Sequence, residues 1–88
     1  SIAQARVESG VTTQWHQLRE TTERYVIMEG SGIVEIGDHP PQNVTPGDVV
    51  YIPPNTRQRI TNTGSQDLIF LALCTPRFVA DNYQIDLT

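Results

Sequence analysis

Turn-forming residues recur at short intervals along the chain, and their spacing constrains the fold more than any other feature. Most are glycine, proline or asparagine, and they stand at residues 10, 30–32, 37–38, 40–41, 46–47, 53–55, 62–64 and 75–76. The runs between them are short and rich in valine, isoleucine, threonine, tyrosine and phenylalanine. This spacing is typical of a β-sandwich or β-barrel, and no stretch shows the apolar period of a capped helix. The sequence therefore predicts an all-β fold.

The candidate strands lie between these turns. We expect them at residues 11–18, 24–29, 32–36, 49–52, 57–62 and 68–74, with weaker strands at 5–8 and 41–44. The run 68–73 is apolar throughout, as in a strand that is buried on both faces, and its second cover would come from another subunit or a terminal arm. Residues 77–88 lack strand alternation and are expected to pack as that arm or to fray.

Pro46 and Gly47 predict a type II turn. Proline fixes φ at the first central position of such a turn, and glycine supplies the positive φ of the second. The strand that follows should end at Pro53 and Pro54, because neither residue can donate a hydrogen bond to a sheet.

The length of 88 residues indicates a single domain over residues 1–88, with a core at about 5–75 and a C-terminal arm at 76–88. A fold this small hides only about 60% of the surface that its unfolded chain exposes. A second subunit would stabilise it, so we expect a homodimer. Six basic against ten acidic residues give a net charge of −4, which argues against nucleic acid and anionic membranes as partners.

Cys74 is the single cysteine, which excludes an internal disulfide and a cysteine-rich zinc site. No apolar run approaches the roughly 20 residues of a membrane span, and no signal peptide is visible. We therefore expect a cytoplasmic protein. The chain starts at Ser1, so an upstream segment could have been removed.

Two sets of residues resemble the paired motifs of the cupins, a family of small β-barrel proteins. The first cupin motif is a glycine, a His-x-His pair, a glutamate and a closing glycine. Gly10, His16, Glu23 and Gly30 fall at its spacings, and Leu18 stands where the second histidine belongs. The chain also resembles the stand-alone cupins described as mannose-6-phosphate-isomerase-like, a description of shape more than of activity.

The second cupin motif is matched less completely. Gly47, Pro53 and Asn62 fit it, whereas Asn55 replaces a glycine and Gln58 replaces a histidine. Together the two motifs cover most of the chain. The joint match is specific for a fold and much less specific for a function.

The resemblance implies a cupin-type double-stranded β-helix, a jelly-roll-like conical barrel that is usually dimeric. It also implies a pocket at one mouth of the barrel, where three histidines and a glutamate would hold a divalent metal. In this chain that set becomes His16, Leu18, Glu23 and Gln58. The expected metal ligands are therefore His16, Glu23 and Gln58.

These three residues would supply few strong donors to a metal ion. The His16 imidazole suits most divalent transition metals. A buried Glu23 needs a charge partner or a cation; otherwise it lies in solvent beside Arg19 or Arg24. Gln58 is neutral and a poor donor to transition metals. We expect a loosely held ion, Mn, Fe, Ni or Zn, with water or substrate completing its shell.

Tyr25 and Gln14 are candidate ligand-binding residues. In a regular strand Tyr25 shares the face of Glu23, and Gln14 lies two residues before His16 on the same face. Each residue either lines the pocket or packs in the core.

Three functions fit these residues. The first is a metal-dependent, isomerase-like enzyme that acts on a small polar or sugar-like molecule, with Glu23 as ligand or proton shuttle. The second is a non-catalytic module that binds a small ligand through His16, Glu23, Gln58 and Tyr25. The third is a vestigial or assembly domain. The sequence favours the first and identifies neither substrate nor reaction.

Overall fold

The computed structural model describes residues 1–86. Within them the chain forms strands and one short 3-10 helix, which confirms the all-β prediction. In chain order the elements are β1 (Ile2–Val7), β2 (His16–Leu18), β3 (Thr22–Glu29), β4 (Gly32–Ile36), β5 (Gln42–Val44), β6 (Val49–Ile52), β7 (Gln58–Asn62), β8 (Leu68–Thr75), η1 (Ala80–Asn82) and β9 (Tyr83–Ile85). No helix in the described part of the chain is long and apolar enough to cross a membrane.

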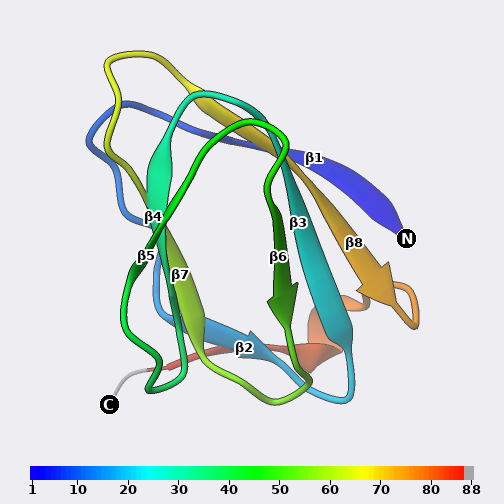
Figure 1. The fold of residues 1–88 in the computed structure, drawn as a ribbon. Coiled ribbons are helices and arrows are strands. Elements are labelled where there is room, and N and C mark those ends of the chain that lie inside the picture. Colours follow the sequence, from blue (N-terminus) through cyan, green and yellow to red (C-terminus); the bar gives the residue numbers. More distant parts are fainter. Residues whose placement is uncertain (87–88) are drawn as a thin grey trace.

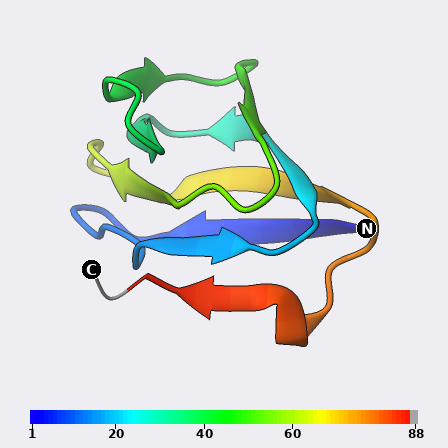
Figure 2. The ribbon, with the colours of Figure 1, turned by 90° about the horizontal axis from the view of Figure 1, so that it is seen from below.

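The strands form two antiparallel sheets that face each other (Figures 1 and 2). Sheet A has the order β1-β8-β3-β6, and sheet B has the order β5-β4-β7-β2-β9. Inward-facing side chains from both sheets fill the space between them. These core residues are Val7, Tyr25, Ile27, Val34, Val44, Val50, Ile52, Ile60, Leu68 and Phe70. The result is a jelly-roll-like barrel with a seam between the edge strands β5 and β6.

The turn before β6 has the predicted geometry. Gly47 has a φ of 95°, and the Asp48 backbone N–H donates to the Thr45 carbonyl at 3.0 Å. The strand that follows ends at Ile52, immediately before Pro53, as expected.

Three strands differ from the sequence-based expectation. The predicted strand at 11–18 is regular only over His16–Leu18, because Thr12 forms an isolated bridge with Thr61 instead of a continuous ladder. β1 begins at Ile2, since it pairs with β8 along its whole length. The tail forms β9, which pairs with β2 (Figure 2). All three residues of β9 are exposed, and the alternation Tyr83-Gln84-Ile85 is too short to identify a strand from the sequence.

β8 is apolar on both faces, but only one face is fully covered. Leu68, Phe70 and Cys74 are buried in the barrel, whereas Ile69, Leu71 and Leu73 are half-buried on the outer side. The tail does not cover this outer side, because β9 pairs with β2 in the other sheet. The expectation that a terminal arm covers the outer side of β8 was therefore wrong. That a second subunit covers it stays a prediction.

Candidate functional site

Two rows of inward-facing side chains meet across one end of the barrel. On sheet B, Gln58 pairs with His16 on one side and with Ile36 on the other. On sheet A, Glu23 pairs with Cys74. Paired residues share a face of their sheet, so strand register brings these side chains together. The loops β2–β3, β4–β5 and β6–β7 surround this end, at the bottom of Figure 1.

A chain of hydrogen bonds links the two rows. Tyr25 donates its hydroxyl hydrogen to Gln58 Oε1, and Gln58 Nε2 donates to Glu23 Oε1 at 2.7 Å. The Cys74 thiol donates to Glu23 Oε2 at a sulfur–oxygen distance of 3.8 Å. Gln58 is 1% exposed and Glu23 is 7% exposed. Because a carboxylate only accepts hydrogen bonds, the amide N–H of Gln58 faces Glu23 and its oxygen is left for Tyr25.

Burial sets the protonation of this cluster. It raises the pKa of Glu23, against the opposing effects of the Gln58 hydrogen bond, the charge on His16 and the Cys74 thiol. Burial, and then the negative charge of Glu23, raise the pKa of Tyr25 well above its usual value and also raise the pKa of Cys74. Tyr25 and Cys74 therefore remain protonated donors, and Glu23 keeps its proton to a higher pH than an exposed glutamate.

His16 lies at the edge of this cluster and is half-buried. Its Nδ1 is 2.8 Å from the Gln14 carbonyl oxygen, which can only accept, so Nδ1 carries a hydrogen and the lone pair of a neutral ring is on Nε2. The ring stacks on Tyr83 from β9, with 4.9 Å between centroids and 18° between planes. Tyr83 was not predicted as a site residue. Its only sequence signal is the short alternation Tyr83-Gln84-Ile85, which does not indicate a contact with His16.

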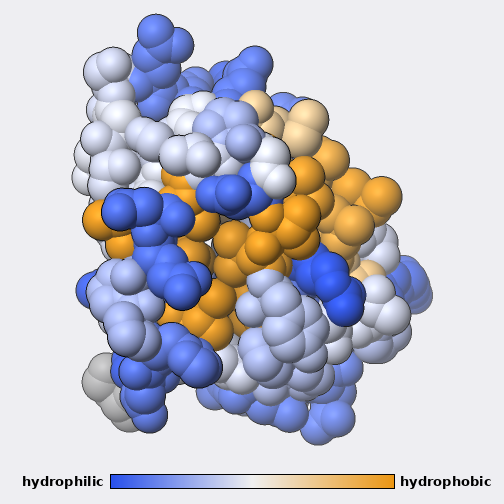
Figure 3. All heavy atoms as spheres, in the orientation of Figure 1, coloured by the Kyte–Doolittle hydropathy of each residue, from blue (hydrophilic) through white to orange (hydrophobic). Residues whose placement is uncertain are grey.

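A hollow opens beside the cluster, at the seam between β5 and β6 (Figure 3). It has a volume of about 390 Å³ and is lined by Val34, Ile36, His39, Pro40, Gln42, Tyr51 and Pro53. One lining residue, Ile36, is the cross-strand neighbour of Gln58, but the hydrogen-bonded residues themselves do not line the hollow. Its walls are mostly apolar, as Figure 3 shows by the orange surface in the depression.

The other residues singled out from the sequence take different places. The Gln14 side chain is exposed, and it is the backbone carbonyl of this residue that contacts His16. Leu18 is 4% exposed. Asn55 has a left-handed φ of 59°, a conformation that asparagine tolerates better than other residues with a side chain. The exchange of the motif glycine for Asn55 therefore preserves the turn.

The sequence profile of the Cupin domain family matches residues 4–74. This chain is a cupin. The protein MJ1618 of Methanocaldococcus jannaschii is 34% identical to it over 85 residues, which are 97% of this chain and 67% of that protein. The glucose-6-phosphate isomerase of Pyrococcus horikoshii is 35% identical over 63 residues. That alignment covers 67% of this cupin but only 33% of the isomerase.

Solved structures agree with the family. A protein with a double-stranded β-helix domain from Klebsiella pneumoniae superposes with a TM-score of 0.85 at 14% identity. The superposition covers 99% of this cupin and 74% of that chain. The predicted cupin-type double-stranded β-helix is thereby confirmed.

The metal that the cupin family implies does not fit the donors in this chain. Leu18 has no donor atom, and the Gln58 amide is used by Glu23 and Tyr25. Within residues 1–86, no three histidine, cysteine, aspartate or glutamate side chains are grouped so that they could hold a metal ion. His16 and Glu23 remain, which is fewer than the three protein ligands of a catalytic zinc or non-haem iron site.

Proposed function

We propose that this cupin is a binding module that holds a small hydroxylated molecule at the Glu23 end of its barrel without a metal ion. The observation that carries the proposal is the double use of the Gln58 amide, which donates to Glu23 and accepts from Tyr25. A buried carboxylate needs a compensating group, and here the amide N–H supplies it. A cation is therefore not required to stabilise Glu23.

The remaining polar atoms define the ligand chemistry. Glu23 Oε2 receives only a long contact from the Cys74 thiol, and no residue within 1–86 bonds to His16 Nε2. Both atoms are acceptors when the carboxyl is ionised and the ring is neutral. A ligand that meets both must bring donors, as hydroxyl groups do.

The hollow adds a steric and electrostatic preference. Its apolar walls can pack against the C–H groups of a compact sugar or polyol, while few polar groups fix orientation. The lining residues include no arginine or lysine, so an unphosphorylated ligand is favoured over a phosphate ester. The name of the Pyrococcus relative, glucose-6-phosphate isomerase, also supports a sugar-like ligand.

Isomerase-like catalysis is the second candidate. The raised pKa of Glu23 beside His16 supports it, because proton transfer needs a carboxyl group whose pKa is shifted toward neutrality. The metal-dependent form predicted from the sequence would hold Mn, Fe, Ni or Zn with His16 and Glu23, assisted by Gln58, with water or substrate completing the shell. The donor set supports that form less than metal-free binding.

Thermal denaturation of chelator-treated protein with a panel of unphosphorylated aldoses and polyols tests the proposal. We expect a rise in Tm with at least one compound, unchanged by chelator. The rise should be lost in Glu23→Gln and kept in the control Glu8→Gln, whose side chain is exposed. A rise that requires added Mn²⁺ or Zn²⁺, or one that survives in Glu23→Gln, would contradict the proposal.

The same compounds separate binding from catalysis. Incubation with the protein in D₂O, followed by NMR of the sugar, detects both a new isomer and exchange at carbon. A binding module gives neither product. Isomer formation that disappears in Glu23→Gln would establish the second candidate instead.

A further inference from the structure

We propose that β9 is a movable lid on the Glu23 end of the barrel, and that a ligand enters when β9 separates from β2. This proposal rests on the proposed function only for the kind of molecule that enters. The movement itself follows from three observations, which are the closure of the site, the weak attachment of β9 and the position of Tyr83.

The acceptor atoms of the site are closed off in this structure. Glu23 is 7% exposed and Gln58 is 1% exposed, and neither residue lines the hollow at the seam between β5 and β6. Leu18, on the inner face of the neighbouring strand β2, is also buried. A molecule that bonds to Glu23 Oε2 therefore needs an opening that forms only when part of the barrel moves.

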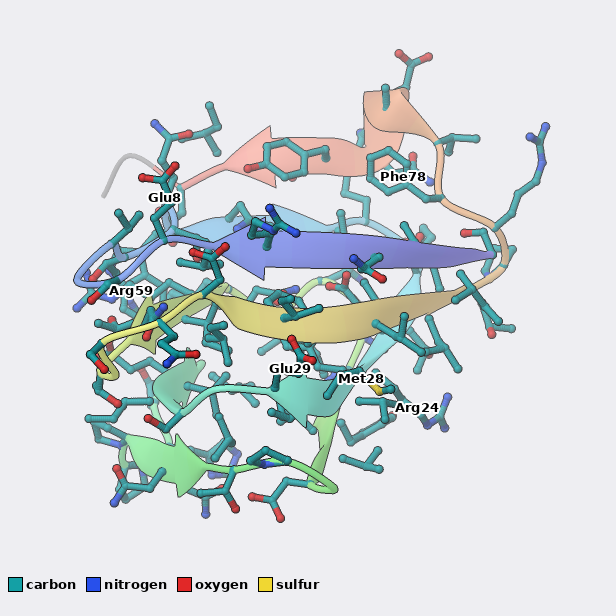
Figure 4. The ribbon with its side chains drawn as sticks, turned by 90° about the horizontal axis from the view of Figure 1, so that it is seen from above. Glu8, Arg24, Met28, Glu29, Arg59 and Phe78 are labelled. Carbon is teal, nitrogen blue, oxygen red and sulfur yellow. The ribbon has the colours of Figure 1, made fainter. Side chains whose placement is uncertain are left out.

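Among the strands at the sheet edges, β9 alone has no side chain in the core. The other edge strands, β1, β5 and β6, supply Val7, Val44 and Val50 to it. From Thr75 to Asp86 no residue is buried. β9 pairs with β2 alone, and Figures 2 and 4 show it as the outermost strand, beside β2. It can therefore leave the barrel without exposing core side chains.

The hydrogen bonds that flank β9 are close to solvent. The Arg19 backbone N–H donates to the Asn82 carbonyl at 2.8 Å, and the Asp86 N–H donates to the Trp15 carbonyl at 2.9 Å. The Arg19 side chain adds a bond from Nη2 to the Asp81 carbonyl at 2.7 Å. A segment with exposed hydrogen bonds and few buried apolar contacts opens at a much lower free energy than the whole fold. We expect β9 to separate from β2 while the two sheets stay folded.

Tyr83 connects this movement to the site. It pairs with the buried Leu18, and paired residues share a face of the sheet, so Tyr83 lies on the inner face. Its ring stacks on His16, which is in turn the cross-strand neighbour of Gln58. When β9 leaves β2, Tyr83 leaves with it, and the opening forms next to the hydrogen-bonded cluster.

Hydrogen exchange followed by NMR tests the attachment of β9 without any ligand. We expect the amide protons of Arg19 and Asp86 to be protected at least about a hundredfold less than that of Ile27. The Ile27 N–H donates to the Asp48 carbonyl in sheet A, so it reports on the opening of the barrel as a whole. Equal protection of the three amides would overturn the proposal, because β9 would then open only with the entire fold.

A disulfide between β2 and β9 tests the lid directly. Gln17 and Gln84 form a cross-strand pair on the outer side of the sheet, and the Cα separation of such pairs, about 4.5–5.5 Å, suits a disulfide. The oxidised variant Gln17→Cys/Gln84→Cys therefore ties β9 to β2 and leaves Tyr83 in place. Ile33→Cys/Thr61→Cys is the matched control, because this pair joins β4 and β7, which both supply core residues.

Alkylation of Cys74 by iodoacetamide reports when the site opens. Cys74 is 6% exposed and its thiol contacts Glu23, so it reacts when the cluster is open. We expect Cys74 to react at least about tenfold more slowly in oxidised Gln17→Cys/Gln84→Cys than in the unmodified chain. The oxidised control should react at the unmodified rate, with mass spectrometry locating the label. Equal rates in the two disulfide variants would overturn the proposal.

A ligand experiment separates the lid from the proposed function. The aldose or polyol that gives the largest rise in Tm should associate at least about tenfold more slowly with the oxidised than with the reduced Gln17→Cys/Gln84→Cys variant, because entry requires the movement of β9. Equal association rates would overturn the entry route. If no aldose or polyol raises the Tm, the proposed function fails, and the exchange and alkylation results still decide whether β9 is a lid.

Discussion

Gln58 and Glu23 are 35 positions apart in the chain, and the Gln58 amide donates to the Glu23 carboxylate at 2.7 Å. Gln58 begins β7 in sheet B, whereas Glu23 is near the start of β3 in sheet A. The bond therefore joins the two sheets inside the barrel. The candidate site is at once a binding cluster and a polar link in an otherwise apolar core, so its residues should affect stability as well as ligand affinity.

Glu23→Gln should change how stability depends on pH. The folded-state pKa of Glu23 is raised above an unfolded value of about 4.3. Between these two values the folded state binds more protons than the unfolded state, so the free energy of unfolding falls as pH rises. Glu23→Gln has no carboxyl group to titrate, so it should lack this fall, which is worth about 1.4 kcal/mol per unit of pKa difference.

Urea denaturation at a series of pH values from acidic to neutral measures this effect. Glu8→Gln, an exposed control, should keep the slope of the unmodified chain. The interpretation fails if Glu23→Gln and Glu8→Gln give the same pH dependence.

Tyr25→Phe should destabilise the fold, although the substitution removes only the hydroxyl group. The Tyr25 hydroxyl donates to Gln58 Oε1, and its loss leaves a buried carbonyl oxygen without a donor, at a cost of about 1–3 kcal/mol. Tyr51→Phe is the matched control, since Tyr51 is 53% exposed and its change should stay within about 0.5 kcal/mol. Chemical denaturation measures both values, and equal losses would contradict the assigned role of Tyr25.

The sequence predicted the fold well because turns and alternation are local signals. The turn at Gly47 and the end of β6 before Pro53 follow from backbone chemistry alone. The convergence of His16, Glu23 and Gln58 followed from the resemblance. The orientation of the Gln58 amide did not, because it depends on a tyrosine and a carboxylate in the opposite sheet. The contact of Tyr83 with His16 also lay beyond the sequence, since a three-residue exposed strand does not indicate which strand it pairs with.

Gly30→Ala should lower the stability of the fold much more than Gly10→Ala. Both glycines have a positive φ, 87° and 78°, so an alanine costs about 1–2 kcal/mol at either position. At Gly30 the added Cβ would also lie 2.7 Å from the Asp67 carbonyl oxygen, whereas at Gly10 it would meet nothing within 4 Å. Thermal denaturation of both variants should separate them clearly. Similar Tm values would show that the backbone near Asp67 can move aside.

The double variant Leu18→His/Gln58→His should gain a metal site that the natural residues do not form. It adds two imidazoles on the inward face that already carries His16, and it frees Glu23 from the Gln58 amide. Four donors suit zinc better than the present two. Calorimetric titration with Zn²⁺ should show tight binding to this variant and not to the unmodified chain. Gln17→His, which adds a histidine on the opposite face of β2, is the control, and circular dichroism checks that each variant folds.

Tyr83→Ala should open one side of the site. The Tyr83 ring stacks on His16 at 4.9 Å, and its removal exposes the imidazole without touching the Glu23–Gln58 bond. Diethylpyrocarbonate modification followed by mass spectrometry measures the reactivity of His16, and the exposed His39 supplies an internal reference in the same sample. We expect His16 to react several times faster in Tyr83→Ala, with His39 unchanged. A ratio of the two rates equal to that of the unmodified chain would mean that Tyr83 does not shield His16 in solution.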